Sequence, residues 1–391
     1  MVVATTMRHH LLLALSMAMA AVPVAILASI YFRSRERANS VAIAVVLLCT
    51  GIALVASFGI RAQVLGWGCF AAFLACIERR DRWAYAAVPI IVLWANVHAS
   101  VLLAPAFLLL RVIGRAADGG ISAAVKSRDV RILALTLPAV LCTPLGWQLP
   151  VYAVTLATSP IRQFIQEWQP VTVHDAEFML GGLPLAALAA AAIIRNGRRD
   201  LDEALPIAAL LVAMLLAVRN VPIFAIAAAP LAARGLDAVF PSLRRFEGRV
   251  AEMERFALVT VSIAIIASTL LLARIAREQP PRTPFAAIAS LGQNGDRRRL
   301  FCENFYACSA ALNYPSIRLF MDGRADPYPL RVWKSYISVI RTEPSWRRIL
   351  RAYDVDSILA TRGSPLATAL AKDTDWKISF SDGAFVVFRY D

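Results

Sequence analysis

The sequence lacks the patterns by which most soluble enzymes are recognised. It contains only 4 histidines and 6 cysteines among 391 residues, and none of their spacings is typical of a zinc site. There is no glycine-rich phosphate loop, no G-x-S-x-G nucleophile elbow and no kinase signature. These absences exclude the protein classes that such motifs define.

Acidic residues are also scarce. The chain has 27 Asp and Glu residues against 41 Lys and Arg, which gives a formal net charge of +14. A strongly basic chain can indicate a nucleic-acid partner. Here, however, no nucleic-acid-binding motif accompanies the charge, and many basic residues cluster in short gaps between apolar runs. We therefore expect no nucleic-acid partner.

Long apolar runs are the dominant feature that is present. Hydrophobic residues make up 59% of the chain, and the mean hydropathy is +0.60. Apolar runs recur from Leu11 to Leu272, whereas charged residues are spread evenly after Arg274. This change predicts a transmembrane helical domain, residues 1–273, and a soluble domain, residues 274–391.

A membrane-spanning helix needs about 20 apolar residues, or somewhat fewer if it is short or re-entrant. The sequence therefore predicts a mainly α, polytopic bundle of about ten spans. We place them at 11–31, 41–59, 62–77, 83–97, 99–114, 132–157, 179–194, 203–218, 221–236 and 255–273. The first resembles a signal peptide around Ala18-Met-Ala20, but it continues to Phe32 and ends in a basic cluster, as an uncleaved span would.

The distribution of basic residues gives an orientation. If the cluster Arg33, Arg35 and Arg37 is cytoplasmic, ten alternating spans place nineteen basic residues inside and four outside before the soluble domain. This agrees with the positive-inside rule. The soluble domain is then extracytoplasmic, as in a periplasm.

Three polar features lie on this external face: the break Trp94-Ala-Asn-Val-His98, the loop pair Glu167-Trp168, and the turn Arg219-Asn220. Each has a structural interpretation. Asn96 and His98 can cap a helix end, Trp168 can be an interfacial anchor, and Arg219 can extend its charge to the interface. Alternatively, the three features form one site, because capping alone does not require them to share a face.

The C-terminal domain reads as α/β. Strands are expected at 299–302, 317–321, 355–360, 376–380 and 384–389, and helices at 307–312, 330–341, 345–353 and 365–371. The segment Asp322-Gly323-Arg324, followed by Tyr328, lies where α/β domains commonly bind ligands; a tight turn held by an Asp–Arg pair is the alternative. Cys302 and Cys308 are close enough in sequence for a disulfide.

Several motifs together resemble a known type of protein. They are Trp94-Ala-Asn-Val-His98, Cys142-Thr-Pro-Leu-Gly146, Ile165-Gln-Glu-Trp-Gln-Pro170, Arg219-Asn220 and Phe320-Met-Asp-Gly-Arg324. In this order they are similar to a family of bacterial polytopic membrane proteins that resembles the GT-C glycosyltransferases. The resemblance implies an inner-membrane helix bundle with an external active face, a polyprenyl-phosphate-linked sugar donor and a periplasmic accessory domain.

The chain departs from the GT-C pattern in one respect. Such enzymes carry an acidic residue in the first external loop, as base or as partner of a divalent metal ion. Here the loop around Gly59–Gln63 contains no acid. We expect that a preceding helix and its acidic loop are missing, which leaves Glu167, Asp175 and Glu177 as the external carboxylates before the soluble domain.

Two hypotheses follow. In the first, the chain is a glycosyltransferase-like protein in which Arg219 meets the donor phosphate and Glu167 or His98 assists proton transfer. Further substrate-binding candidates are Asn96, Trp168, Asn220, Asp322, Arg324 and Tyr328. In the second, it is a non-catalytic scaffold of envelope assembly whose C-terminal domain binds a partner. A transporter ranks last, because intramembrane charge is sparse and no internal repeat is evident.

Overall fold

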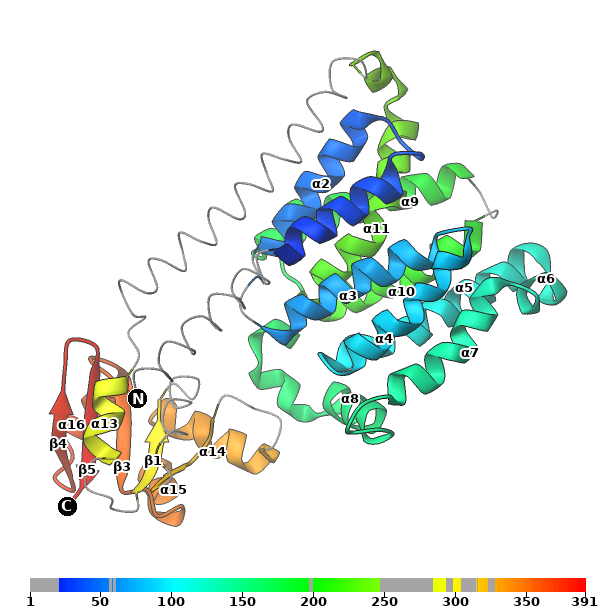
Figure 1. Ribbon diagram of the computed structural model, residues 1–391. Coiled ribbons are helices and arrows are strands. Elements are labelled where there is room, and N and C mark those ends of the chain that lie inside the picture. Colours follow the sequence, from blue (N-terminus) through cyan, green and yellow to red (C-terminus); the bar gives the residue numbers. More distant parts are fainter. Residues whose placement is uncertain are drawn as a thin grey trace, which may run out of the picture. The chain divides into compact units, whose positions relative to one another are not determined.

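The computed structural model describes residues 21–55, 58, 61–196, 200–246, 284–292, 298–303, 314, 316–322 and 328–391 (Figure 1). By internal contacts the chain divides into two units. The first comprises Met1–Thr158 and Ile165–Arg274, and the second comprises Ser159–Phe164 and Ile275–Asp391. The short segment Ser159–Phe164 therefore belongs with the C-terminal unit, although the sequence places it between predicted spans.

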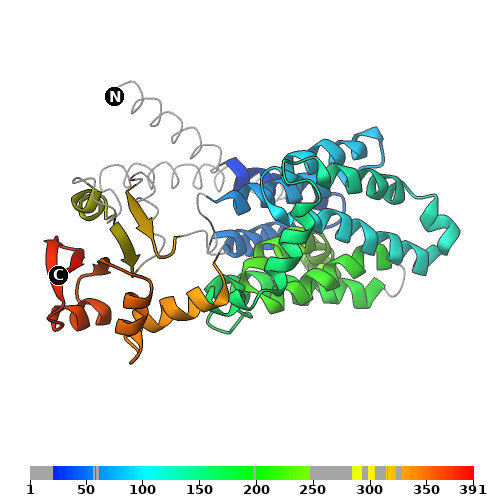
Figure 2. The same ribbon diagram turned by 90° about the horizontal axis from the view of Figure 1, so that it is seen from below.

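The first unit is helical throughout its described part (Figures 1 and 2). After a helix at Ala21–Ser34, its α-helices are α2 (Ser40–Val55), α3 (Ala62–Ile77), α4 (Ala87–Ala95), α5 (Leu103–Gly119), α6 (Ile121–Val125), α7 (Arg128–Leu141), α8 (Gln148–Thr158), α9 (Leu183–Asn196), α10 (Leu201–Leu216) and α11 (Val221–Val239). Short helices join them: η1 (Arg82–Ala86), η2 (Ala99–Leu102), η4 (Gln166–Trp168), the π-helix η5 (Glu177–Gly182), η7 (Val218–Asn220) and η8 (Pro241–Phe246).

Within the described ranges, three helical stretches are long and apolar enough to cross a membrane: Ala99–Gly119, Glu177–Arg195 and Val218–Val239. Four shorter apolar helices accompany them, at Ala21–Ser34, Ser40–Val55, Ala62–Ile77 and Arg82–Ala95. The expected count of about ten spans is therefore not confirmed, and the expected span 255–273 lies outside the described residues.

The expected single span 132–157 is wrong. The chain forms two helices here, because α7 ends at Leu141 and α8 begins at Gln148. Pro144 cannot donate a helical hydrogen bond, and Gly146 has a φ of 50°, in the left-handed region that glycine adopts most easily. The apolar composition of this stretch concealed the turn.

Helix α11 is the buried centre of the first unit. Its membrane-length stretch is 89% buried, against 28% for each of the other two, as expected for a helix that is apolar on all sides. It packs against α9, α2, α10 and α3. Gly235 allows the closest approach, because a Cβ atom there would lie 1.8 Å from the carbonyl oxygen of Leu188 in α9.

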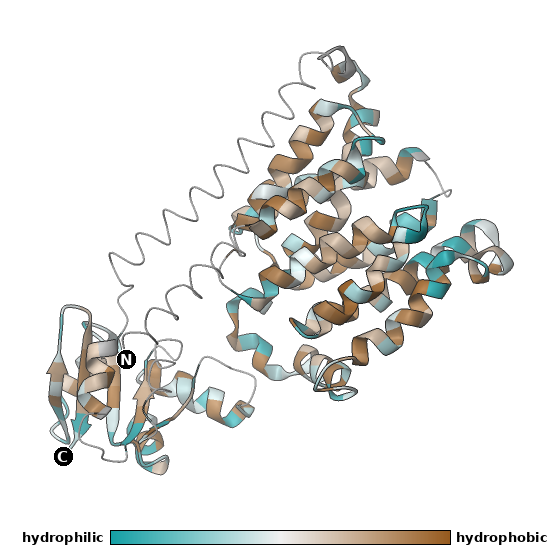
Figure 3. Ribbon diagram, in the orientation of Figure 1, coloured by the Kyte–Doolittle hydropathy of each residue, from teal (hydrophilic) through white to brown (hydrophobic). Residues whose placement is uncertain are grey.

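The helices of the first unit are largely hydrophobic in composition, as their brown ribbons in Figure 3 show, and the outer ones expose large apolar side chains. Examples from six different helices are Leu48, Leu93, Leu109, Leu137, Val154 and Val212. Soluble monomers rarely expose so much apolar surface. This surface and the apolar helices indicate a membrane protein.

Ion pairs tie the helix ends together on the face that the charge count takes as cytoplasmic. Arg33 binds Glu78 at 2.6 Å, and Glu203 accepts from both Arg37, at 2.6 Å, and Arg234, at 2.7 Å. Many of the basic residues that set the expected orientation therefore also join helices to one another.

The second unit contains a five-stranded sheet of order β2-β1-β3-β5-β4 (Figure 1). Its strands are β1 (Arg298–Cys302), β2 (Ile317–Leu319), β3 (Ser357–Thr361), β4 (Trp376–Ser381) and β5 (Phe385–Tyr390). Strand β1 is parallel to β2 and β3, whereas β5 is antiparallel to β3 and β4. All five expected strands are confirmed, with small shifts at their ends.

Helices cover the sheet. They are α13 (Phe285–Gly292), α14 (Leu330–Ile340), α15 (Trp346–Ala352) and α16 (Pro365–Ala371). The short η3 (Pro160–Phe164) packs against α14, where Phe164 stacks on Trp333. Because side chains alternate along a strand, Leu300 and Cys302 pack with α13, whereas Phe301 stacks on Tyr336 of α14. Cys302 is disulfide-bonded; Cys308 and the expected helix 307–312 lie outside the described residues.

Replacement of Gly235 by alanine tests the close contact between α9 and α11. We expect Gly235→Ala to destabilise the protein by about 1–3 kcal/mol, because the new methyl group forces the helix backbones apart. Gly51→Ala is the matched control, since a Cβ atom there has no neighbour within 4 Å. Thermal unfolding in detergent measures both variants, and equal unfolding temperatures would contradict the contact.

Replacement of Asp129 tests the buried ion pairs. Its fully buried carboxylate accepts a hydrogen bond from Arg111 at 2.9 Å and forms an ion pair with Arg115 at 3.2 Å. We expect Asp129→Asn to cost about 3 kcal/mol, because it removes the buried carboxylate of this network and leaves both arginines with Asp202 as their partner, at 3.8 and 3.3 Å. In the control Asp81→Asn the altered residue belongs to an exposed pair with Arg79, so its unfolding temperature should not change. An unchanged temperature for Asp129→Asn would show that the pair contributes nothing.

Candidate functional site

The break after α4 is held by a side-chain amide. Asn96 Nδ2 donates to the carbonyl oxygens of Val92, at 2.9 Å, and Cys142, at 2.8 Å. Carbonyl groups in the last turn of a helix lack intrahelical donors, and these two belong to the ends of α4 and α7. Asn96 therefore has the contacts of a capping residue, which is the structural interpretation of this position.

His98 follows two residues later and begins η2. Its Nδ1 atom accepts the backbone N–H of Ser100 at 3.1 Å and lies 2.8 Å from the Ser100 hydroxyl. Burial and the positive charge of Arg219 lower the pKa of His98 to about 4. The imidazole is therefore neutral at physiological pH, and Arg219 is close enough to influence it.

Glu167 lies between two arginines from distant parts of the chain. Its Oε2 accepts from Arg61 Nη1 at 3.1 Å, and its Oε1 lies 3.8 Å from Arg219 Nη1. The side chain of Arg219 is 18% exposed, against 36% for Glu167 and 60% for Arg61. Side-chain exposure therefore increases from Arg219 through Glu167 to Arg61.

Arg219 makes further contacts that fix its plane. Its guanidinium carbon lies 4.4 Å from the centre of the Trp168 ring, a cation–π contact. Its Nη2 donates to Gln63 Oε1 at 3.4 Å. The backbone N–H of Val218 also donates to the carbonyl of Gln169 at 3.0 Å, so the loop after Ile165 and the turn before α11 are joined.

Asn220 and Asp175 have local roles. Asn220 Nδ2 donates to the carbonyl of Ala213 in the last turn of α10 at 2.8 Å. Asp175 Oδ2 accepts from the backbone N–H and the hydroxyl of Thr172, at 2.6 and 2.8 Å. Both side chains therefore hold backbone turns, as capping residues do.

The structure brings Glu167, Trp168 and Arg219 together, with His98 close to Arg219. Sequence reasoning missed two members of this cluster, Arg61 and Gln63. Arg61 was counted only as one of the few external basic residues, although its place in the acid-free loop before α3 was a usable signal. Gln63 carries no charge, so the sequence contained no signal that would have identified it.

The candidate substrate-binding residues Asp322, Arg324 and Tyr328 belong to the second unit. Asp322 is buried, and its backbone N–H donates to the Tyr328 hydroxyl at 3.1 Å. Arg324 lies outside the described residues. We assign no further role to Asp322 and Tyr328.

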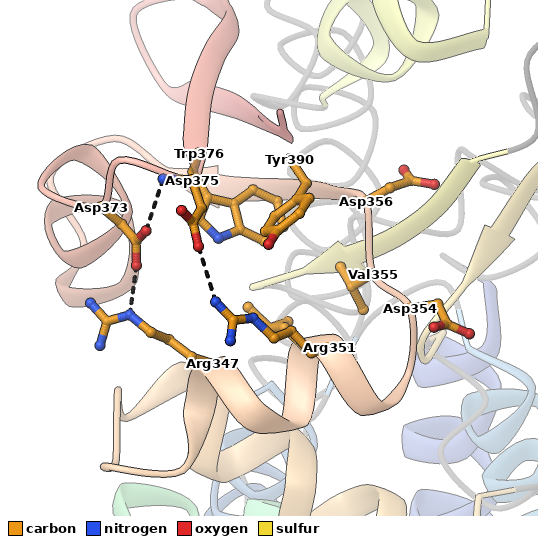
Figure 4. Close-up of a pocket in the computed structure, with 10 residues that line it drawn as sticks. Arg347, Arg351, Asp354, Val355, Asp356, Asp373, Asp375, Trp376 and Tyr390 are labelled. Atoms are coloured by element: carbon orange, nitrogen blue, oxygen red, sulfur yellow. Dashed lines mark hydrogen bonds and ion pairs between the residues drawn. The ribbon is translucent and has the colours of Figure 1, made fainter.

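A cavity of about 270 Å³ also lies in the second unit. Figure 4 shows Arg347 and Arg351 of α15 facing Asp373 and Asp375 before β4, at 2.6 and 3.0 Å. Burial acts to raise the pKa of Asp373, but the hydrogen bonds from Arg347 and from the backbone of Asp375, together with the charges of both arginines, lower this pKa overall. Sequence reasoning missed the cavity, although the two arginines four residues apart on a helix were a usable signal. Both arginines are already paired, so the cavity offers a ligand few uncommitted charges.

The residues around Glu167 do not fit a metal ion. Across the described ranges, no group of three or more His, Cys, Asp or Glu side chains could hold one. The two guanidinium groups beside Glu167 also repel a divalent cation. We therefore derive no step through the divalent metal ion that the GT-C resemblance left open.

No protein-family model and no curated protein sequence matches the chain. Among solved structures it is similar to the oligosaccharyltransferase AglB from Archaeoglobus fulgidus, determined with an inhibitory peptide and a dolichol-phosphate. The TM-score is 0.51 and the identity 11%, over 88% of this chain and 58% of AglB. It is also similar to ArnT from Cupriavidus metallidurans, with a TM-score of 0.46 and 16% identity over 95% of this chain and 83% of ArnT.

The similarity to AglB concerns the fold alone, and the chain spans less than two thirds of the length of that protein. AglB is a GT-C glycosyltransferase. The resemblance of this chain to the GT-C glycosyltransferases, which the sequence motifs indicated, is confirmed at the level of the fold.

Proposed function

We propose that this protein transfers a sugar from a polyprenyl-phosphate donor to an extracytoplasmic acceptor. The observation that carries the proposal is the position of Glu167 between Arg61 and Arg219, with Trp168 against the second arginine. Two guanidinium groups around one carboxylate leave one positive charge in excess. Such a site suits an anionic group such as a phosphate.

Arg219 and Arg61 would bind the phosphate of the donor. Guanidinium groups bind phosphate oxygens with paired hydrogen bonds. Trp168 and Gln63 hold the plane of Arg219, which limits the conformational entropy lost on binding. An arriving phosphate competes with Glu167 for both arginines and thereby releases the carboxylate towards the acceptor.

Glu167 would then accept a proton. The acceptor hydroxyl oxygen forms a bond to the anomeric carbon of the sugar while the bond from that carbon to the phosphate oxygen breaks. The electron pair leaves with the polyprenyl phosphate, and the hydroxyl proton moves to Glu167. A positioned carboxylate contributes about 10²–10⁴-fold to such a step.

The proposal includes the orientation of the protein in the membrane. The charge distribution puts the loop of Glu167, the turn of Arg219 and the C-terminal domain on the periplasmic side of a bacterial inner membrane. A donor anchored in the bilayer would approach the arginines from the lipid phase. The C-terminal domain would then shape access for the acceptor.

Separate replacement of Glu167 and Arg219 tests the activity. We expect Glu167→Gln and Arg219→Gln each to reduce product at least about 100-fold, because one removes the proton acceptor and the other a phosphate ligand. The measurement is mass spectrometry of envelope glycans from a deletion strain complemented with each variant at equal protein level. Arg79→Gln, which alters an exposed arginine paired with Asp81, is the control.

The same experiment tests the alternative hypothesis, that the protein is a non-catalytic scaffold. If both variants restore the wild-type glycan profile as well as Arg79→Gln does, transfer by this site is excluded. The cluster around Glu167 would then be a structural ion pair that joins α3, the loop and α11.

Topology reporters test the orientation. We expect alkaline phosphatase fused after Asp391 to be active and green fluorescent protein at that position to be dark, because only the first matures in the periplasm. Fusions after Arg80, in the loop between α3 and η1, should give the reverse pattern. Equal behaviour of the two fusion points would overturn the assignment.

A further inference from the structure

A chain of hydrogen bonds runs from Trp94 to His98. Trp94 Nε1 donates to the Ser100 hydroxyl oxygen at 3.0 Å, and that oxygen lies 2.8 Å from His98 Nδ1. The backbone N–H of Ser100 also donates to Nδ1, at 3.1 Å. Nδ1 therefore faces the nitrogen and the hydroxyl of the same residue.

These contacts decide where the ring proton of His98 lies. A backbone N–H and an indole N–H act only as donors. Nδ1 must accept from the backbone amide of Ser100. The Ser100 hydroxyl oxygen accepts a hydrogen bond from the indole N–H of Trp94, and its own O–H then donates to Nδ1. In the neutral ring the remaining proton is then on Nε2.

Helix α3 connects this arrangement to the phosphate-binding arginine. A Cβ atom at Gly66 would lie 3.1 Å from Ser100 Oγ and 3.2 Å from Trp94 Nε1, so the helix backbone borders the hydrogen-bonded chain closely. Gln63, three residues earlier and thus on the same helix face, accepts from Arg219. Ser100, His98 and Arg219 therefore lie along one face of α3.

We infer that His98 is a neutral hydrogen-bond donor to the donor phosphate, through Nε2–H, and that Ser100 and Trp94 are positioning residues that fix this tautomer. The phosphate part rests on the proposed function, whereas the tautomer does not. A ring that already carries a proton on Nε2 cannot accept one there, so proton transfer falls to Glu167. The low pKa of His98 supports this assignment, because the imidazole stays neutral beside Arg219.

Nitrogen NMR of the full chain tests the tautomer. With ¹⁵N-labelled histidine the chain gives signals from only 4 rings, and His98→Gln identifies those of His98 by their loss. We expect a protonated Nε2, an unprotonated Nδ1, and no titration between pH 7.5 and 5.5. Ser100→Ala should shift the Nδ1 resonance, which a purely structural role of the hydroxyl would not do. A protonated Nδ1, or a titration in this range, overturns the inference.

Two isosteric variants test the donor role. The amide nitrogen of glutamine can stand in for Nε2, whereas that of asparagine stands in for Nδ1. With undecaprenyl phosphate as the probe, we expect His98→Gln to retain wild-type affinity within about threefold, and His98→Asn to lose tenfold or more, the scale of a hydrogen bond to a charged group. Equal losses in both variants overturn the donor role, provided that both unfold at the wild-type temperature.

Arg219→Gln separates the two proposals in the same binding experiment. If the wild type binds undecaprenyl phosphate and Arg219→Gln does not, the phosphate site stands and the His98 variants decide the donor role. If the wild type fails to bind the lipid, the phosphate site and the donor role both fall. The NMR result then still decides the tautomer alone.

Discussion

The burial of α11 is the constraint on which the rest of the first unit depends. Its residues from Val221 to Ala233 are all buried, and Gly235 lets it touch the backbone of α9. A helix enclosed in this way has no freedom to shift along its axis. The turn that precedes it is fixed as well, and with it the guanidinium of Arg219. The cluster around Glu167 thus adjoins the most deeply buried of the membrane-length helices.

Charge is handled differently at the two faces of the bundle. On the face taken as cytoplasmic, Arg33 and Arg234 each bind carboxylates from other helices, and the side chains are largely withdrawn from solvent. On the other face, Glu167 is shared by two arginines, one of which, Arg61, is largely exposed. Exposed ion pairs contribute little to stability, so the Arg61–Glu167 pair can open at small cost. This difference in exposure is consistent with the proposed entry of a phosphate at the Arg61–Glu167 pair.

Much of the fold could be predicted because it follows from local patterns. Alternating and short apolar runs predicted the strands of the second unit, and the span 62–77 coincides with α3. The turn at Pro144 and Gly146 was missed because the surrounding stretch is as apolar as a continuous span. Hydropathy measures composition over a window and does not detect a break that two residues cause.

The site could be predicted only in part. The shared face of Glu167 and Arg219 followed from the charge count, but their contact did not, since the residues are far apart in sequence. Arg61 and Glu167 are separated by 106 positions, and no local rule connects them. Contacts of this kind depend on how helices pack, which one sequence without tertiary information does not reveal.

The polar residues beside the helix breaks differ in the hydrogen bonds that they make with the backbone. Every break in a helix leaves carbonyl groups that need donors, and Asn96 and Asn220 provide them with their side-chain amides. His98 does the opposite, because its Nδ1 atom accepts a backbone N–H. Residues that look alike in the sequence, each a polar group beside an apolar run, therefore differ in what their hydrogen bonds leave available. The break that begins at Trp94 thus contains an amide that satisfies backbone carbonyl groups, Asn96, and the residue that we propose as a hydrogen-bond donor to a phosphate, His98.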